Sequence, residues 1–549
     1  MIICKLDHVA HQYVTQPVLR DVTWEIHTGH KIGLVGANGA GKSTLLRLIA
    51  GELAPESGAI YRQKDQRIGY LAQEPALDPQ RTVWQEALGG AAEVVAAEAE
   101  LRRLEGRMAD PAVAADEAAL ARVMAAYDRA HHAFEQVGGY AAESRVRGIL
   151  ASLGLRPDQL DQPVGQLSGG QRKLVGLAKL LAADANFLLL DEPDNHLDLE
   201  AKADLERLIA EFPGTVVIVS HDRYLLDGCV THIAEVEDGK LTSFAGDYSA
   251  YAVDKQLRLL RQQQMYEAQQ KEIARIEAAI ARFEYWASVV VNERHAKQAR
   301  SRRKMLDRME RIEQPTLERR RMDLDLGGWR GSHKVLEIVG LGKAFADEGG
   351  DARVVLDGLD LLIWHGERVG LLGPNGAGKT VLLRCILGQE EPTAGEVRVG
   401  PSVEIGHYAQ QHETLDLDHT LIEEVRLVKP MYESQAAAFL GRFLFPYEMT
   451  RKRVRELSGG ERNRLQLAKL MLRDTNFLLL DEPTNNLDLP SCEVLEGALD
   501  DYQGTVLVVS HDRYFLDRVV DRIVELDGGR LTEYPGDYTY YAGKKAARK

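Results

Sequence analysis

The sequence GLVGANGAGKSTLL at residues 33–46 decides the fold, and it recurs as GLLGPNGAGKTVLL at residues 370–383. In both copies an apolar segment precedes the glycine-rich turn and a leucine-rich segment follows it, which predicts a strand, a loop and a helix. Three further segments occur twice in the same order: LSGGQRKLVGLAKLL (167–181) and LSGGERNRLQLAKLM (457–471), NFLLLDEPDNHLDL (186–199) and NFLLLDEPTNNLDL (476–489), and VSHDRYLLD (219–227) and VSHDRYFLD (509–517). The chain therefore contains two copies of one α/β domain.

The spacing between the copies locates an insertion. Lys42 and Lys379 are 337 residues apart, whereas Ser168 and Ser458 are only 290 residues apart. The first copy therefore holds 47 additional residues between Gln73 and Ser168.

Two stretches rich in Ala, Leu, Glu and Arg predict helices outside the repeated segments. In the insertion, segments on either side of Pro111 predict a helical hairpin over about residues 88–140. Between the copies, residues 255–313 predict a second hairpin with its turn near Val289–Arg294, and Pro315 ends it.

The glycine-rich turns have the spacing of a phosphate-binding loop, or P-loop. Glycine lets successive backbone N–H groups face phosphate oxygens, and the following helix N-terminus adds a favourable dipole. We expect Lys42 and Lys379 to reach the β- and γ-phosphates, and the hydroxyls of Ser43 and Thr380 to bind Mg²⁺. The predicted phosphate-binding residues are Gly36, Ala37, Asn38, Gly39, Ala40, Gly41, Lys42, Ser43 and Thr44, and Gly373, Pro374, Asn375, Gly376, Ala377, Gly378, Lys379 and Thr380.

The FLLLD segment of each copy predicts a parallel strand that is buried on both faces. Asp191 and Asp481 end these strands, at the sheet edge where α/β folds bind ligands, and carboxylate oxygens suit Mg²⁺. Glu192 and Glu482 follow directly and are placed to polarise an attacking water.

The two LSGG segments, with Gln73, Gln410, His221 and His511, resemble the motifs of ABC ATPases. In that family two cassettes dock head to tail with two ATP molecules between them, each held by one P-loop and the other cassette's LSGG. The resemblance implies a first ATP site of Lys42, Ser43, Gln73, Asp191, Glu192 and His221 with Ser458, Gly459 and Gly460. It implies a second ATP site of Lys379, Thr380, Gln410, Asp481, Glu482 and His511 with Ser168, Gly169 and Gly170. Backbone N–H groups of Ser and Gly before a helix would form a second anion cradle.

Tyr13 and Phe345 precede the P-loops, where ABC cassettes carry an aromatic ring that stacks on adenine, although core packing is the alternative. Asp194 stands where the second copy has Thr484 and the family usually has Thr. Its charge either slows the first site or simply faces solvent, and we favour the solvent-facing interpretation.

The whole chain resembles the ABC-F family through its tandem cassettes, its DEPDNHLDL and DEPTNNLDL segments, its inserted hairpin and its linker. ABC-F proteins are ribosome-bound translation factors and antibiotic-resistance factors, with the linker hairpin directed toward the peptidyl-tRNA. The resemblance implies an ATPase that acts on rRNA and peptidyl-tRNA as a monomer with an intramolecular cassette dimer. We expect a first cassette at 1–253, a linker at 254–331 and a second cassette at 332–549.

The linker's charge agrees with an RNA partner. Residues 255–322 contain 17 Lys and Arg against 9 Asp and Glu, although the whole chain has a net charge of −15. Cationic side chains can reach phosphates, and aromatic rings can stack on unpaired bases. A solvated helix face is the alternative. The candidate RNA-binding residues are Arg294, Lys297, Arg300, Arg302, Arg303 and Lys304.

The N-terminal sequence, the apolar runs and the cysteine spacing narrow the range of possible functions. The N-terminus MIICKLDHVA shows no secretion signal, no apolar run approaches about 18 residues, and the four cysteines form no CxxC pair, so we expect a cytoplasmic protein without a membrane partner. An exporter ATPase subunit or a DNA-maintenance ATPase stays open, and intact Glu192 and Glu482 oppose an inactive scaffold. The sequence does not separate housekeeping translation from drug resistance, nor show whether the two sites are equally active.

Overall fold

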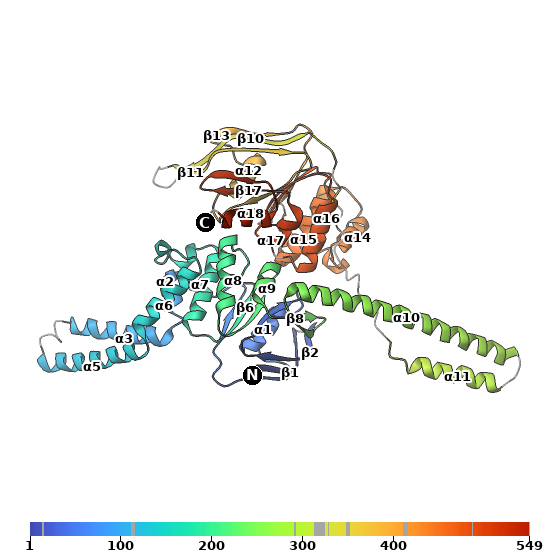
Figure 1. The fold of residues 1–549 in the computed structure, drawn as a ribbon, viewed down its shortest axis with the longest axis horizontal. Helices are drawn as coiled ribbons and strands as arrows, with labels where there is room; N and C mark the ends of the chain where they lie inside the picture. Colours follow the sequence, from blue (N-terminus) through green and yellow to red (C-terminus); the bar gives the residue numbers. More distant parts are fainter. Residues whose placement is uncertain are drawn as a thin grey trace. The chain divides into compact units, whose positions relative to one another are not determined.

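The computed structural model describes residues 1–13, 16–110, 113, 116–289, 293–311, 324, 326–327, 329–346, 352–409, 415–485 and 487–547. Its internal contacts divide the chain into two units, of which one comprises Met1–Asp247 with Met322–Lys549 and the other Tyr248–Arg321. The first unit contains both cassettes, and the second contains the linker. Figure 1 shows the helices and strands of each.

A six-stranded sheet forms the centre of each cassette, with five parallel strands and one antiparallel edge strand. The first sheet has the order β5-β6-β7-β3-β8-β9, with β3 (Lys31–Val35), β5 (Ile68–Leu71), β6 (Phe187–Asp191), β7 (Thr215–Val219), β8 (His232–Glu237) and β9 (Lys240–Ala245). The second has the order β14-β15-β16-β12-β17-β18, with β12 (Arg368–Leu372), β14 (Ile405–Tyr408), β15 (Phe477–Asp481), β16 (Thr505–Val509), β17 (Arg522–Asp527) and β18 (Arg530–Tyr534). The predicted α/β fold class is confirmed.

Runs of consecutive apolar residues explain why β6 and β15 occupy central positions. Every residue of both strands is buried, because helices or a second sheet cover each face of a parallel sheet. Their last residues, Asp191 and Asp481, therefore emerge at the carboxyl edge of the sheet, as predicted.

A three-stranded antiparallel sheet completes the core of each cassette. These sheets have the orders β2-β1-β4, with β1 (Ile2–Tyr13), β2 (Gln16–His27) and β4 (Ser57–Arg62), and β11-β10-β13, with β10 (Lys334–Ala346), β11 (Ala352–Trp364) and β13 (Ala394–Val399). In the first cassette, Ile3 and Leu6 of β1 share one buried cluster with Leu45 and Leu46 of the helix after the P-loop. This packing fixes where the P-loop helix begins.

The remaining helices of the cassettes pack on the sheets or on one another. In the first cassette they are α1 (Lys42–Ala50), α2 (Val83–Leu88), α6 (Gly139–Ser152), α7 (Gly169–Ala182), α8 (Leu199–Glu211) and α9 (Arg223–Cys229). In the second they are α12 (Lys379–Ile386), α13 (Leu421–Val428), α14 (Glu433–Arg442), α15 (Gly459–Leu472), α16 (Leu489–Asp501), α17 (Arg513–Val519) and α18 (Tyr538–Ala546). Short 3₁₀ helices span Pro157–Gln159, Val164–Gln166, Tyr447–Met449 and Val454–Glu456.

The insertion of the first cassette forms the expected helical hairpin. Helices α3 (Ala92–Met108) and α5 (Glu117–Gln136) lie side by side in Figure 1. Val94 and Leu101 of α3 and Phe134 of α5 form a small buried cluster, which is what holds two exposed helices together. Pro111, where we expected the turn, lies outside the described residues.

The linker also contains a pair of packed helices, α10 (Tyr248–Val289) and α11 (Glu293–Asp307). Ile276 and Ile280 of α10 and Ala299 of α11 are buried, which gives the pair an apolar seam. The expected turn near Val289–Arg294 falls mainly on residues outside the described ranges. None of the described helices has the length and apolarity that crossing a membrane would require.

We expect Phe187→Ala to lower the free energy of unfolding by about 3–5 kcal/mol, because the ring is fully buried in β6 and its loss leaves a cavity. Tyr61→Ala on strand β4 is the control, since that side chain is 60% exposed, and its effect should stay within about 0.5 kcal/mol. Urea unfolding measures both, and equal midpoints for the two variants would contradict this assignment of the core.

Candidate ATP-binding sites

Both P-loops hold their lysine over the loop's own backbone. The Lys42 ammonium donates to the carbonyl oxygens of Gly36 at 2.8 Å and Ala37 at 3.1 Å. In the second cassette Lys379 donates to Gly373 at 2.6 Å and to Pro374 at 3.1 Å. Burial lowers the pKa of both lysines, while the carboxylates of Glu192 and Glu482 counteract that effect. Each P-loop thus holds a lysine ammonium against its own backbone.

The loop conformation needs glycine at defined positions. Gly36 and Gly373 have φ of 150° and 153°, and a Cβ atom there would lie 2.4 Å and 2.2 Å from the carbonyl oxygens of Val236 and Leu526. The last glycines, Gly41 and Gly378, are left-handed and precede α1 and α12 without a side-chain cap. The N–H groups at both helix N-termini are therefore not capped by their own side chains and are oriented to accept an anion.

The acidic residues predicted at the sheet edge lie beside the P-loops. In the second site the Thr380 hydroxyl donates to Asp481 at 3.4 Å, and in the first a hydrogen bond from Ser43 acts on Asp191. Burial raises the pKa of Asp191, and it is 2% exposed. A hydroxyl and a carboxylate therefore meet in each site.

Glu192 and Glu482 adopt a strained backbone conformation, with φ of 50° and 52°. Non-glycine residues rarely occupy this region, and such strain is concentrated at functional sites. Burial, followed by the charge of Asp481, raises the pKa of Glu482 to about 8. Burial and then Asp191 also raise the pKa of Glu192. Both carboxylates are thus stronger bases than an exposed glutamate.

The predicted histidines face these glutamates. His221 Nε2 lies 3.7 Å from Glu192 Oε1, and His511 Nε2 lies 3.5 Å from Glu482 Oε1. Burial, with a smaller effect from Lys42, lowers the pKa of His221 to about 3. Burial also places the pKa of His511 well below its ordinary value. Both imidazoles are therefore neutral at pH 7.

The two glutamates differ in their hydrogen bonds. Glu192 Oε2 accepts from Gln73 and from Asn195, each at 2.7 Å. Glu482 Oε2 instead accepts from the backbone N–H of His511 at 3.2 Å. Gln410, the predicted counterpart of Gln73, lies outside the described residues.

Each P-loop is contacted by the other cassette. Asp488 Oδ2 accepts from the backbone N–H of Asn38 at 3.0 Å, and Asp198 Oδ2 accepts from that of Asn375 at 3.3 Å. The Asn375 amide also donates to the His196 carbonyl at 3.2 Å. Asp198 and Asp488 cap helices α8 and α16 at the same time. The two cassettes are thus joined reciprocally at their P-loops.

Sequence reasoning did not assign a role to Asp198 or Asp488. Their signal was the LDL ending that both copies share, DNHLDL and TNNLDL, which predicts an N-cap but not the contact across the cassettes.

The signature segments begin helices α7 and α15. Ser168 and Ser458 each form a capping box with the residue three positions on, which leaves the LSGG backbone at a helix N-terminus. Gly170 packs against His196, because a Cβ atom there would lie 2.5 Å from the His196 carbonyl oxygen. Since Asn375 binds the same carbonyl, the first signature lies next to the second P-loop.

Charged side chains connect the two cassettes around the sites. Arg223 pairs with Glu496 at 3.3 Å and lies over the Tyr514 ring, with 4.2 Å between the guanidinium carbon and the ring centroid. Symmetrically, Arg513 pairs with Glu206 and lies 5.0 Å from the Tyr224 centroid. The two arginine pairs correspond to each other in the same reciprocal way as the two P-loop contacts.

The exposure of Tyr13, Phe345 and Asp194 tests what the sequence suggested for these three residues. Tyr13 and Phe345 are 45% and 39% exposed, so neither ring is a core residue. Asp194 is only 3% exposed, so the solvent-facing interpretation that we favoured is wrong. The sequence pattern misled because a single aspartate is usually exposed, whereas this one is surrounded by buried lysines of its own cassette.

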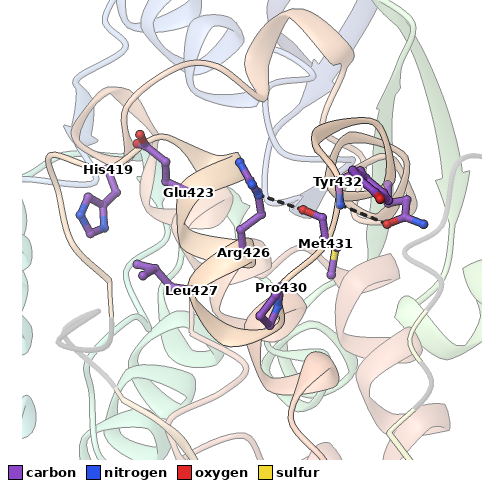
Figure 2. A pocket seen from close by; sticks show the side chains of 8 residues that line it. His419, Glu423, Arg426, Leu427, Pro430, Met431 and Tyr432 are labelled. Carbon is purple, nitrogen blue, oxygen red and sulfur yellow. Dashed lines mark hydrogen bonds between the residues drawn. The ribbon is translucent and has the colours of Figure 1, made fainter.

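A surface pocket lies elsewhere in the second cassette, where α13 ends and α14 begins (Figure 2). It is lined by His419, Glu423, Arg426, Leu427, Pro430, Met431, Tyr432 and Gln435. None of the residues predicted to bind ATP lines this pocket.

Two P-loops, two sheet-edge carboxylate pairs and two LSGG helices, joined across the cassettes, define a tandem ATP-binding cassette ATPase. A family model described as ABC transporter matches residues 19–195 and 356–485, and a second model with that description matches residues 234–325.

Named relatives with similar sequences support the same family assignment. ABC transporter F family member 5 of Arabidopsis thaliana is 36% identical, over 98% of this chain and 77% of the relative. The putative ATP-binding protein YdiF of Bacillus subtilis is 39% identical, over 99% and 83%. The energy-dependent translational throttle protein EttA of Escherichia coli K12 is 37% identical, over 95% and 92%. The chain belongs to the F family of ABC proteins.

A solved structure has the same fold. The archaeal ribosome recycling factor aABCE1, crystallised with the ribosomal stalk protein aP1, superposes with a TM-score of 0.59 at 20% identity. The match covers 98% of this chain and 92% of that one. At this identity the likeness concerns the fold alone.

We expect Gly373→Ala to weaken ATP binding at the second site by about tenfold or more, because the new methyl group meets the Leu526 carbonyl and the backbone is strained. Gly441→Ala in α14 is the control, since nothing lies within 4 Å of that position. A fluorescent ATP analogue should show two binding sites per chain for the control and one strong site for Gly373→Ala. Identical binding by both variants would contradict the assignment.

Proposed function

We propose that this protein is an ATP- and Mg²⁺-dependent switch that binds the ribosome when its cassettes are closed and modulates translation. The observation that carries the proposal is the reciprocal contact of each P-loop with the other cassette's aspartate. Nucleotide bound at either loop would lie at a junction of two cassettes, so that ATP favours their docking and hydrolysis lets them separate.

In this proposal each ATP site has the same division of roles. The P-loops with Lys42 and Lys379 bind the phosphates, and the rings of Tyr13 and Phe345 stack on adenine. Glu192 and Glu482 accept a proton from the attacking water, and His221 and His511 orient the γ-phosphate region as neutral donors. The LSGG residues of the opposite cassette complete each phosphate site.

The oxygen donors at the sheet edge fit Mg²⁺. A threonine or serine hydroxyl lies beside an aspartate in each site, and Asp191 Oδ1 is buried without a hydrogen-bond partner among the described residues. Hard oxygen ligands of this kind suit the ion. When bound, Mg²⁺ would neutralise charge on the β- and γ-phosphates, with Ser43, Gln73 and Asp191, and Thr380, Gln410 and Asp481, as its protein ligands.

The linker supplies the surface for RNA. Lys297, Arg300 and Lys304 are exposed on α11, and their spacing places them on one face of the helix. Within the described residues they form no ion pair. Arg302 instead lies over the Phe283 ring at 5.4 Å and Arg303 pairs with Glu284 at 2.9 Å, so these two residues hold the hairpin together. Three of the candidate cations are therefore available for phosphates.

In this proposal the surface binds rRNA and peptidyl-tRNA, and the protein acts in the cytoplasm. The name of the EttA relative, a translational throttle, supports a role in translation. The cassettes at 1–253 and 332–549 would convert nucleotide state into closure, and the linker at 254–331 would carry closure to the RNA. Arg294 would add to the same surface, although its side chain lies outside the described residues.

We expect the variant Glu192→Gln/Glu482→Gln to sediment with purified bacterial ribosomes in ATP but not without it, because it retains both phosphate sites and loses both bases. Adding Lys297→Gln, Arg300→Gln and Lys304→Gln should abolish most of this binding and flatten its salt dependence.

The matched control neutralises Lys64, Lys240 and Arg530, which are equally exposed but lie on the cassettes. It should leave sedimentation unchanged. If the protein binds ATP yet never sediments with ribosomes, the ribosome proposal fails, and ATP-dependent binding to membranes or branched DNA would then be tested.

A further inference from the structure

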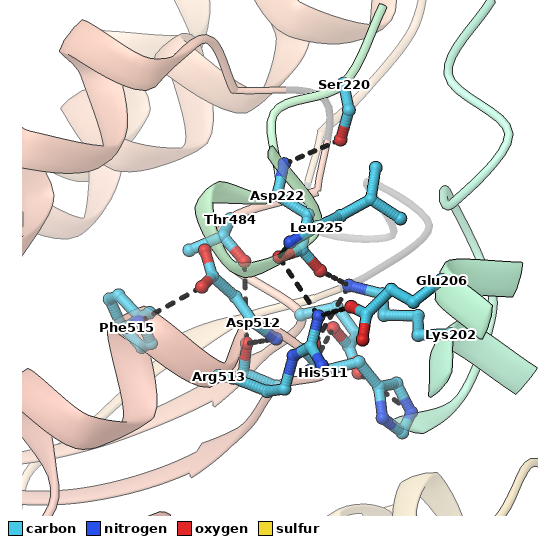
Figure 3. A network of polar contacts seen from close by, with 12 residues as sticks. Lys202, Glu206, Ser220, Asp222, Leu225, Thr484, His511, Asp512, Arg513 and Phe515 are labelled. Atoms are coloured by element: carbon cyan, nitrogen blue, oxygen red, sulfur yellow. Dashed lines mark hydrogen bonds and ion pairs between the residues drawn. The ribbon is translucent and has the colours of Figure 1, made fainter. Parts of the chain in front are cut away.

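One buried lysine reaches from the first cassette into the second ATP site. Lys202 in α8 is 8% exposed, and its ammonium donates to Asp222 Oδ2 and to the backbone carbonyl oxygen of His511, each at 2.9 Å. Figure 3 shows Lys202 and Asp222 of the first cassette meeting His511 of the second. Although burial disfavours its charge, the carboxylates of Asp222 and Asp194 raise the pKa of Lys202, so it stays protonated.

His511 is held on both sides. Its carbonyl oxygen accepts from Lys202, and its N–H donates to the Glu482 carboxylate at 3.2 Å. Two hydrogen bonds therefore connect a side chain of the first cassette with the base of the second site. Because charged donors form the stronger hydrogen bonds, the position of Lys202 constrains the His511 backbone and, through it, Glu482.

The first ATP site has no such connection among the described residues. The position of Lys202 is taken by Cys492 in the second cassette, and the position of Asp194 by Thr484. Cys492 is buried, but a thiol is only a weak donor and carries no charge when protonated. Glu192 is held instead by Gln73 and Asn195 of its own cassette. Among the described residues, only the base of the second site is linked to a side chain of the opposite cassette.

Asp194 adds a second carboxylate near this lysine, besides its ion-pair partner Asp222. It is buried in the same region, where the charges of Lys202 and Lys173 act on it, and Thr484 and Asn463 replace Asp194 and Lys173 in the second cassette. A buried lysine without enough counter-charge would be costly. Asp194 and Lys202 thus occur together in the first cassette, and both are replaced in the second.

We propose that Lys202 is a positioning residue for the second ATP site, supplied in trans by the first cassette. Hydrolysis at the second site then requires the docked arrangement that brings Lys202 to His511, whereas hydrolysis at the first site has no reciprocal requirement. The inference rests on the roles proposed above for Glu192 and Glu482, and it makes the two sites unequal.

The test separates the two sites with one glutamate substitution each. In Glu192→Gln, where the second site alone retains its base, adding Asp194→Thr and Lys202→Cys should lower single-turnover hydrolysis by about tenfold or more at unchanged ATP affinity. In Glu482→Gln, the same pair of substitutions should change hydrolysis by a clearly smaller factor, and any change there reflects the Asp194 charge that acts on Glu192. The pair copies residues that the second cassette already uses and removes one charge of each sign, so folding is preserved.

Two controls complete the experiment. Cys492→Ala changes the matching position of the second cassette and should affect neither background. Asp194→Thr/Lys202→Arg restores a cation and should recover part of the lost rate, which a purely steric role would not predict.

Equal losses in both backgrounds would show that the pair only stabilises the cassette interface and would overturn the proposal, as would no loss in either. If Glu192→Gln/Glu482→Gln itself still hydrolyses ATP, the assignment of the bases fails, and the inference fails with it. Sedimentation with ribosomes reports on the translation role independently of both results.

Discussion

The contact of each P-loop with an aspartate of the opposite cassette is the interaction on which the rest of this structure depends. The N–H groups of Asn38 and Asn375 belong to the P-loops, and each donates a hydrogen bond to a carboxylate of the opposite cassette. Because Asp488 and Asp198 are also N-caps, the same side chains start the helices that carry the interface residues. Loop geometry, helix position and cassette docking are therefore set together and do not vary independently.

Much of this arrangement could be predicted from the sequence, because each motif occurs in both copies of the repeat. Two P-loops, two buried FLLLD strands and two capped LSGG helices follow from local patterns at constant spacing, and the structure contains all of them. The contacts across the cassettes could not be predicted, since they join residues such as Asn38 and Asp488 that are 450 positions apart. The solvent-facing interpretation of Asp194 was wrong for the same reason, because the burial of that side chain depends on tertiary packing.

Charged and aromatic side chains cross the interface between the two cassettes. Arg223 and Arg513 each combine an ion pair with a tyrosine ring of the other cassette. Buried ion pairs contribute little net stability, because desolvation offsets much of their attraction. Surfaces of this kind can separate without exposing large apolar patches to water, which suits two cassettes that must open and close in every cycle.

The joint presence of Asp194 and Lys202 in one buried cluster also restricts how the two halves of the chain can diverge or be exchanged. Either residue alone would change the charge balance of the buried cluster that also holds Asp222, so a route of single substitutions from Thr and Cys passes through a less stable intermediate. The two codons lie close together, however, and a recombination tract copied from one half of the gene to the other would transfer both at once. Such an event would change positions 194 and 202 together, because they are only eight residues apart. The difference between the two cassettes would therefore be gained or lost in one step.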